Sequence, residues 1–313
     1  MKFIKKKLLK VVFGITFFLL VFPSQGYGWW NTGHLVAADI TYRQLTPPTK
    51  KKVDELTKVL APFYSPHGQT FVTSSTWCDE VRGSQRFSLF DFLHYTDKPY
   101  DPENILTESD YKVIEASIQN HDVVWAVTET KKILASPHAN DLEKALALRL
   151  FIHLATDLHN PLHTISLYSQ NTPQGDLGGN LFKIRGTPVP TLHKLWDSGC
   201  GRFLPVGSPP SVVELRNIQI RSLEITKKHP PKSFSEKNIL DPKIWAEEGY
   251  QLGISHVYKI PFNSLVDKKY LMQGRYISER RIVLAGYRIA RILNTIFDPE
   301  SQKFKKKHTL IVQ

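Results

Sequence analysis

The sequence contains only two cysteines in 313 residues, and this shortage already excludes one class of metal protein. Closed structural zinc sites are usually built from several cysteines, so a cysteine-rich zinc module is not possible here. The two residues, Cys78 and Cys200, can form at most one disulfide, and such a bond requires an oxidising compartment. We expect that pairing if the chain is exported.

Several other features are scarce or missing. After residue 22 no apolar run is long enough to cross a bilayer, and we see neither an internal repeat nor a low-complexity linker. Clean alternation of apolar and polar residues is scarce, so the chain has little strand signal. No Asn-x-Ser/Thr sequon occurs, which fits a bacterial secreted protein. The scarcity of strand signal favours an all-α fold, and the lack of a linker leaves one large domain or two small ones.

The first 28 residues have the layout of a secretory signal peptide. Five lysines precede an apolar run at 11–22, Pro23 ends that run, and small residues Gly26 and Gly28 precede Trp29. The alternative is an uncleaved membrane anchor, but a spanning helix needs about 20 apolar residues. We expect cleavage after Gly28, leaving residues 29–313 as a soluble, monomeric protein in the periplasm or the medium. No stable protein partner and no membrane contact after cleavage are indicated.

The charge of the chain is strongly basic. The formal net charge of +12 would fall to +7 on loss of the signal peptide, because that segment holds five lysines and no acid. A basic surplus favours an anionic partner such as a polynucleotide. We expect the lysine-rich run at 303–307 to be a solvated tail, beginning at about residue 300, rather than a binding arm.

Apolar residues recur at helical spacing through most of the chain. We expect Asp141 to cap a helix over 141–159 that Pro161 stops. Other helices are expected at 33–44, 48–60, 73–82, 110–135, 213–226, 241–258 and 279–294, with long loops at 61–69, 172–190 and 205–211. One short strand is expected at 181–185.

Histidine and aspartate recur together in two stretches, and a further histidine, His34, lies near the start in the stretch 29–34. His153 and Asp157, like His193 and Asp197, are four residues apart, which places both side chains on one face of a helix. Imidazole and carboxylate are the ligands that zinc takes at sites that stay open for chemistry. A single such pair is often structural, but two pairs with more histidine and aspartate nearby predict a metal site.

The same stretches belong to a longer series of motifs. The series runs in order as WWNTGH at 29–34, TWCDEVR at 76–82, LHY at 93–95, HLATDLHNPLH at 153–163, GDLGGN at 175–180, LHKLWD at 192–197 and, more weakly, LAGYRIA at 284–290. Together these blocks resemble the S1/P1 nuclease family over nearly all of the mature chain. The resemblance implies a single compact multi-helix domain of the phospholipase C/P1 nuclease type.

The resemblance also implies an activity and a cofactor. Members of this family are zinc-dependent endonucleases that act on single-stranded DNA and RNA, give 5′-phosphorylated products and often hydrolyse 3′-nucleotides. Three zinc ions are implied. The first would be held by Asp79, His94, His153 and Asp157, the second by His163, His193 and Asp197, and the third by the amine and carbonyl of Trp29 with His34 and Asp157.

Four further residues receive roles near these ligands. Arg82, one helical turn from Asp79, is placed to stabilise charge at phosphorus; the alternative is a surface salt bridge. With Asp79 it makes up the expected catalytic pair. Tyr95 would stack a nucleobase and Asp97 would bind its edge, unless they are a core tyrosine and a loop cap. Asn180 could contact substrate, or its segment could simply form a tight turn.

Two rival functions remain at this stage. A zinc-dependent phospholipase C shares the helical fold and a trinuclear site, but its last metal pair ends in glutamate where this chain has Asp197. Its first ligand histidine also lies further from the N-terminus than His34. A structural zinc protein is the other rival, and the open His/Asp ligand set disfavours it. His159, which lies between two expected ligands, faces away from the His153 stripe and is not expected to bind metal.

Overall fold

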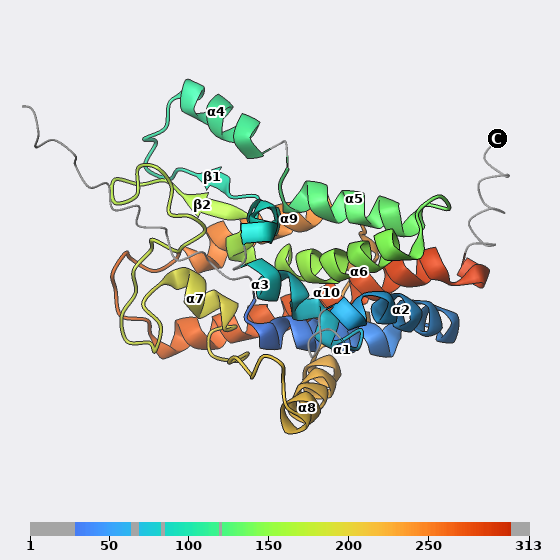
Figure 1. Ribbon diagram of the computed structural model, residues 1–313. Helices are drawn as coiled ribbons and strands as arrows, with labels where there is room; N and C mark the ends of the chain where they lie inside the picture. The colour runs from blue at the N-terminus through green and yellow to red at the C-terminus, as the bar shows by residue number, and fades with distance from the viewer. Residues whose placement is uncertain (1–28, 64–68, 83–84, 119–120, 302–313) are drawn as a thin grey trace, which may run out of the picture.

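The computed structural model describes residues 29–63, 69–82, 85–118 and 121–301, without the side chains of residues 82–89. Helices dominate this part of the chain and form one body (Figure 1). The α-helices are α1 (Asn31–Gln44), α2 (Pro47–Leu60), α3 (Trp77–Arg82), α4 (Glu108–Ile118), α5 (Val123–Ala135), α6 (Asp141–Asp157), α7 (Leu192–Asp197), α8 (Val212–Lys228), α9 (Pro242–Leu252) and α10 (Lys268–Phe297). The all-α prediction is confirmed.

Short elements connect these helices and bring polar residues into the interior. The 3-10 segments beside the future site are η2 (Thr73–Thr76), η3 (Gln85–His94) and η4 (Pro161–His163), and the π-helical turn η7 (Gly253–Val257) extends α9. Others are η1 (Ala61–Phe63), η5 (Pro231–Ser233) and η6 (Glu236–Asn238). Strands β1 (Lys98–Tyr100) and β2 (Ile165–Leu167) form a two-stranded parallel sheet, with Lys98 opposite Ile165.

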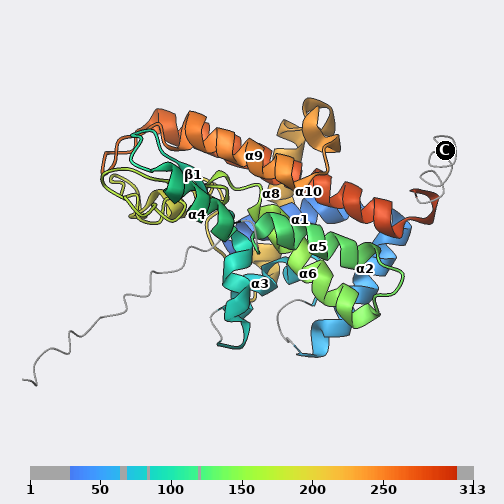
Figure 2. The same ribbon diagram turned by 90° about the horizontal axis from the view of Figure 1, so that it is seen from above.

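Helices α1, α6 and α10 form the centre of the molecule. Helix α6 packs on α2 and α5, while α1 packs on α8 and α10, and Figure 2 shows α10 running along most of the body. Gly286 of α10 permits the close approach to α1, because a Cβ atom there would lie 2.6 Å from Cγ2 of Ile40. The most buried face of α6 carries His153 and Asp157, so the fold encloses them in its core.

Side-chain caps determine where several helices begin. Asn140 accepts a hydrogen bond from the backbone of Glu143, whose carboxylate accepts one from the Asn140 N–H in return. The expected cap at Asp141 is therefore wrong by one residue. Ser211 and Glu214 make the same reciprocal pair at the start of α8.

Three expectations about secondary structure are corrected. The expected helix at 110–135 is two helices, because Asp122 caps a new helix by accepting from the Trp125 N–H. Helix α10 begins at Lys268, where Asp267 caps it, well before the expected residue 279. The expected strand at 181–185 has only isolated bridges, through Lys183 and Arg185.

The expected disulfide is also corrected. Cys78 and Cys200 are both buried and both free. The thiol of Cys78 lies 4.0 Å from the Arg149 carbonyl of α6, whereas Cys200 packs against Gly274 of α10. The two thiols thus have separate surroundings. In the described residues, no helix is both long and apolar enough to span a membrane. The expected signal peptide at 1–28 and the tail at 303–307 lie outside the described residues.

Candidate metal centre

Two helices present their histidine and aspartate one turn apart, as the spacing predicts. In α6 the Nε2 atom of His153 lies 3.2 Å from Oδ2 of Asp157, and in α7 Nε2 of His193 lies 3.2 Å from Oδ2 of Asp197. All four side chains are buried. The sequence spacing therefore produces two pairs of ligand atoms that face the same interior region.

The fold brings these pairs together with histidines and aspartates from distant segments. Three groups have ligand atoms within 4.8 Å of one another: His34, Asp79 and His153; His94, His153 and Asp157; and His163, His193 and Asp197. Eight of the nine expected metal-binding residues belong to these groups, and the ninth is Trp29. The third group holds the same residues that the family resemblance assigns to one zinc ion.

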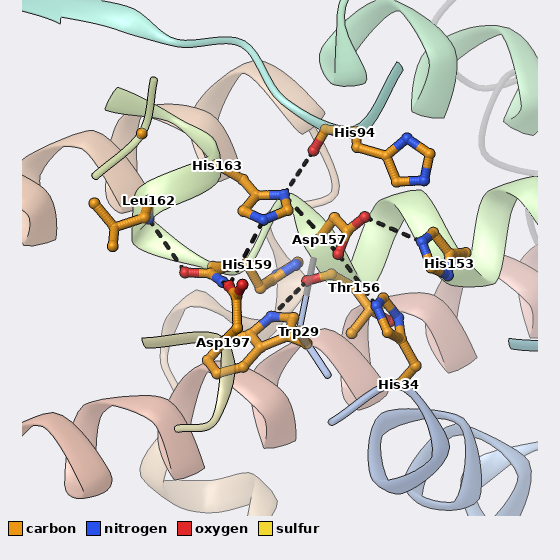
Figure 3. Close-up of polar contacts among 12 residues, drawn as sticks. Trp29, His34, His94, His153, Thr156, Asp157, His159, Leu162, His163 and Asp197 are labelled. Atoms are coloured by element: carbon orange, nitrogen blue, oxygen red, sulfur yellow. Dashed lines mark hydrogen bonds and ion pairs between the residues drawn. The ribbon is translucent and has the colours of Figure 1, made fainter. Parts of the chain in front are cut away.

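Asp157 lies at the centre of the arrangement (Figure 3). Its Oδ1 is 3.3 Å from Nε2 of His34, whereas its Oδ2 is 3.2 Å from Nε2 of His153. The rings of His34 and His153 are stacked, with centroids 3.9 Å apart. Each carboxylate oxygen of Asp157 thus faces a different imidazole, which is the geometry that a bridging carboxylate requires.

Trp29 is buried beside this centre. Its indole N–H donates to the Thr156 carbonyl at 3.1 Å, and its ring meets Phe203 edge-on. The following residue, Trp30, donates its backbone N–H to the Asp197 carbonyl at 3.1 Å. These contacts place the backbone of Trp29 close to two ligand-bearing helices, α6 and α7.

Backbone carbonyls orient four of the histidine rings. Each ring donates its Nδ1–H, because a carbonyl can only accept, and this leaves Nε2 to face the group. The acceptors are Phe90 O for His94, Ser75 O for His153 and His94 O for His163, each at 2.7 Å, and Gly178 O for His193 at 2.6 Å. Fixed orientation of this kind is typical of histidines that bind metal.

Buried polar atoms at the centre provide a direct test of whether a cation fits. Among the described residues, hydrogen-bond partners are lacking for both ring nitrogens of His34, Nε2 of His153 and both carboxylate oxygens of Asp157. Nε2 of His34 lies 3.3 Å from Oδ1 of Asp157, and Nε2 of His153 lies 3.2 Å from Oδ2, in neither case with hydrogen-bond geometry. Leaving so many buried polar atoms unsatisfied is costly, and metal ions coordinated by them would remove that cost. The residues therefore fit a polynuclear metal centre.

The electrostatics favour an ionised carboxylate at the centre. Burial alone would raise the pKa of Asp157, but the imidazoles of His153, His34 and His163 hold that pKa well below its usual range. Burial also disfavours the charged form of His153 and by itself would lower its pKa, yet Asp157 and Asp79 raise that pKa to about 9. In His34 burial and the neighbouring His153 lower the pKa. A metal ion would replace the proton that His153 otherwise holds.

Asp79 lies at the edge of the centre, on the side where the centre is accessible from the surface. Its Oδ1 is 3.8 Å from Nε2 of His94 and 3.7 Å from Nε2 of His153. A hollow of about 330 Å3 reaches it, lined by Trp30, Asn31, Thr76, Asp79, Glu80, Pro205 and Ser208. The Arg82 side chain, expected beside Asp79, lies outside the described residues. The centre is thus buried on most sides and accessible through this hollow.

The structure describes all three expected substrate-binding residues, Tyr95, Asp97 and Asn180. Asp97 is partly exposed, has a left-handed backbone with φ of 37°, and its pKa is raised well above its usual range by burial and by Asp176. Tyr95 is half-buried, and its carbonyl accepts from the Val123 N–H. Asn180 donates its side-chain amide to the Leu177 carbonyl within a turn, so its observed role is local.

Two residues that hold the turn at 175–180 in place, Asp176 and Tyr258, were not identified as functional from the sequence. Asp176 is buried and accepts from the Leu167 N–H at 2.9 Å and from the Tyr258 hydroxyl at 2.8 Å. It holds the turn in which Gly178 presents its carbonyl to His193, and a Cβ atom at Gly178 would clash with the Leu162 carbonyl at 2.4 Å. Asp176 lies within the motif at 175–180, but nothing in the sequence marks Tyr258.

His159 does not join any of the metal-binding groups. It is buried, donates Nδ1–H to the Ala155 carbonyl, and accepts from Arg288 at its Nε2. Burial and the charges of Arg281 and Arg288 lower its pKa well below the usual range, so the ring is neutral. Its role is to connect the end of α6 to α10.

Comparison with known proteins decides the family. The family model described as S1/P1 Nuclease matches residues 29–298. The chain belongs to the S1/P1 nuclease family. It is 27% identical to Endonuclease 2 of Arabidopsis thaliana over 310 residues, covering 94% of this chain and 99% of that protein. It is 24% identical to Nuclease S1 of Aspergillus oryzae, covering 86% of this chain and 92% of that protein.

Family membership establishes the class of reaction. The protein is a metal-dependent nuclease that hydrolyses phosphodiester bonds in nucleic acid. The phospholipase C alternative is not favoured, because both the family and its named relatives are nucleases.

The central position of Asp157 leads to a prediction for its removal. Asp157→Asn should lower bound metal and reduce hydrolysis by at least about 100-fold, because a neutral amide cannot bridge two cations. Plasma emission spectroscopy measures the metal and a nuclease assay the rate. Asp141→Asn, an exposed position at the start of the same helix, is the matched control and should change neither. Full metal content in Asp157→Asn would contradict the bridging role.

Proposed function

We propose that the protein is a zinc-dependent endonuclease that cuts single-stranded DNA and RNA to 5′-phosphorylated products and also hydrolyses 3′-nucleotides. The observation that carries this proposal is the set of three His/Asp groups, two of which share His153, with Asp157 facing both His34 and His153. Membership of the S1/P1 nuclease family supports the same activity. Secretion or export to the periplasm, as a monomer, is part of the proposal.

Three zinc ions are the proposed cofactors. The first is assigned to Asp79, His94, His153 and Asp157, the second to His163, His193 and Asp197, and the third to Trp29, His34 and Asp157. Zinc held at these positions supplies Lewis acidity, which lowers the pKa of water and stabilises charge at phosphorus. The carbonyl partners of the histidine rings keep Nε2 directed at these positions, so little reorganisation is needed during catalysis.

The Trp29 ligand links the site to export. An amide nitrogen cannot bind zinc as a free amine can, so the proposed third site requires that the chain begin at Trp29. The buried indole, anchored on the Thr156 carbonyl, would hold the new amine beside Asp157. Cleavage of residues 1–28 therefore becomes a step in assembling the enzyme.

The residues beyond the metal centre are proposed to bind one nucleotide. Tyr95 follows the ligand His94 directly, so a base stacked on its ring would lie next to the reacting phosphate. Asp97 has a raised pKa, and a neutral carboxyl group offers a donor and an acceptor to the edge of a base. Arg82 is proposed to stabilise charge at phosphorus with Asp79, and Asn180 to shape the same surface. Stacking of an unpaired base requires a single strand.

Zinc should stabilise the fold as well as catalyse, because its ligands connect segments from residue 29 to residue 197. Chelation should abolish hydrolysis of single-stranded RNA, single-stranded DNA and 3′-AMP and lower the melting temperature, and added zinc should restore both. Phosphatidylcholine serves as the control substrate and should not be cut. Full activity in metal-free protein would contradict the proposal.

The maturation step can be tested with two matched proteins that differ in one residue. A protein that carries one extra residue before Trp29 should lose one zinc ion per chain and most of its activity while remaining folded. Native mass spectrometry counts the metal, and circular dichroism checks the fold. Equal zinc content and equal rates in the two proteins would exclude Trp29 from the site.

Base binding can be separated from chemistry at Tyr95. Tyr95→Ala should cost about 1–3 kcal/mol of substrate binding, the usual scale for one base–aromatic stack. Zinc content should be unchanged, whereas His94→Ala should lose metal. An abasic ribose-phosphate substrate provides the control, since its turnover should hardly change. Equal losses on nucleotide and abasic substrates would show instead that Tyr95 only supports His94.

A further inference from the structure

A second cavity lies between α8, α10 and the loop that follows α7. Figure 1 shows where these elements lie in the fold. Its volume is about 710 Å3, which is in the range that small-molecule sites occupy. Four basic side chains line it, and none belongs to the metal centre: Arg202, Arg221, Lys228 and Arg275.

The acidic residues near this cavity do not balance its basic residues. Glu279 lines the cavity and accepts from Arg202 at 2.6 Å and from Lys228 at 2.5 Å. Arg202 also pairs with Glu224 at 2.6 Å. Even if both glutamates are counted against the four basic residues, two positive charges remain. These are associated with Arg221 and Arg275, for which no carboxylate partner is found among the described residues.

Both of these arginines are held in place by the backbone. Arg221 donates from Nη1 to the Arg202 carbonyl at 2.7 Å, and Arg275 donates from Nε to the Cys200 carbonyl at 2.9 Å. A guanidinium has five N–H groups, so donors remain for a phosphate. Burial and the charge of Arg202 lower the pKa of Arg221 more than Glu224 and Glu279 raise it, so a bound anion would offset an existing electrostatic cost.

The cavity also offers an aromatic surface. Tyr276 lines it with 48% of its surface exposed, and Met272 and Leu204 beside it are 69% and 60% exposed. Large apolar side chains on a cavity wall next to basic groups suit a ligand with a flat base and a phosphate. Free phosphate alone would not use them.

One extended segment separates this cavity from the metal centre. Leu204 and Val206 line the cavity, whereas Pro205 between them lines the hollow that reaches Asp79. Asn31 exchanges two hydrogen bonds with the Val206 backbone, at 2.8 and 3.1 Å, and the Thr32 hydroxyl donates to the Leu204 carbonyl. The wall is therefore fixed and only one segment thick, and a strand that crosses it reaches both sides.

We propose that this cavity is a second nucleotide subsite, which binds a phosphate on Arg221 and Arg275 and a base on Tyr276, from a nucleotide of the substrate strand outside the cleaved bond. This inference rests on the proposed nuclease function on single strands. It implies that strands of several nucleotides bind better than 3′-nucleotides, which fill the metal centre alone.

The test measures, in each variant, the KM for a single-stranded 20-mer divided by the KM for 3′-AMP. Arg221→Gln should raise the ratio of these KM values about 5-fold and make the salt dependence of 20-mer binding shallower by about 0.7 in log–log slope. The matched control is Arg216→Gln, an exposed arginine on α8 outside the cavity, which should leave the ratio at the wild-type value. An equal change in both variants would overturn the proposal, since it would reflect overall charge.

Two variants at Met272 keep the test independent of the arginine contacts. Met272 is 69% exposed, so a new charge there should not unfold the protein. Met272→Glu should raise the KM ratio and Met272→Lys should lower it, each by about 3-fold. If the KM ratio is unchanged in both Met272 variants and hydrolysis remains sensitive to chelator, the second subsite is excluded while the proposed nuclease function stands. Loss of chelator-sensitive hydrolysis in the wild type would instead contradict the proposed nuclease function.

Discussion

The buried carboxylate of Asp157 is the constraint on which the rest of the site depends. It lies on the innermost face of α6 with imidazoles around it, and these hold its pKa well below the usual range. A buried charge of this kind is tolerated only when it is paired or coordinates a metal. The helices packed around α6 exclude water from the centre, and one of them, α1, also supplies His34, which faces Asp157.

The loops around this centre act as supports for its ligands. Carbonyls of Ser75 and Gly178 orient histidines that come from other parts of the chain, and the carbonyl of Phe90 orients His94 within η3. The turn at 175–180 is held in turn by Asp176 and Tyr258. Because each support is a backbone group, it fixes the orientation of its histidine ring, which is what efficient catalysis requires.

Much of this site could be predicted from sequence because its signals are local. The pairs His153/Asp157 and His193/Asp197 follow from helix geometry, and the family motifs added His34, Asp79, His94 and His163. The grouping of His34 with Asp79 and His153 could not be predicted, because it depends on how α1 packs against α6. Tyr258 and the cavity beside α8 were missed for the same reason, since long-range contacts leave no local pattern. The disulfide prediction was wrong because compartment and cysteine count say nothing about geometry.

The central proposal is that three zinc ions bind at the assigned positions: Asp79, His94, His153 and Asp157; His163, His193 and Asp197; and Trp29, His34 and Asp157. Anomalous difference maps from crystals of the mature protein, recorded on either side of the zinc absorption edge, test it most directly. The account predicts three zinc peaks, with Asp157 contacting two of them and the Trp29 amine contacting one. Peaks away from these residues, or no zinc peak within the groups, would contradict it.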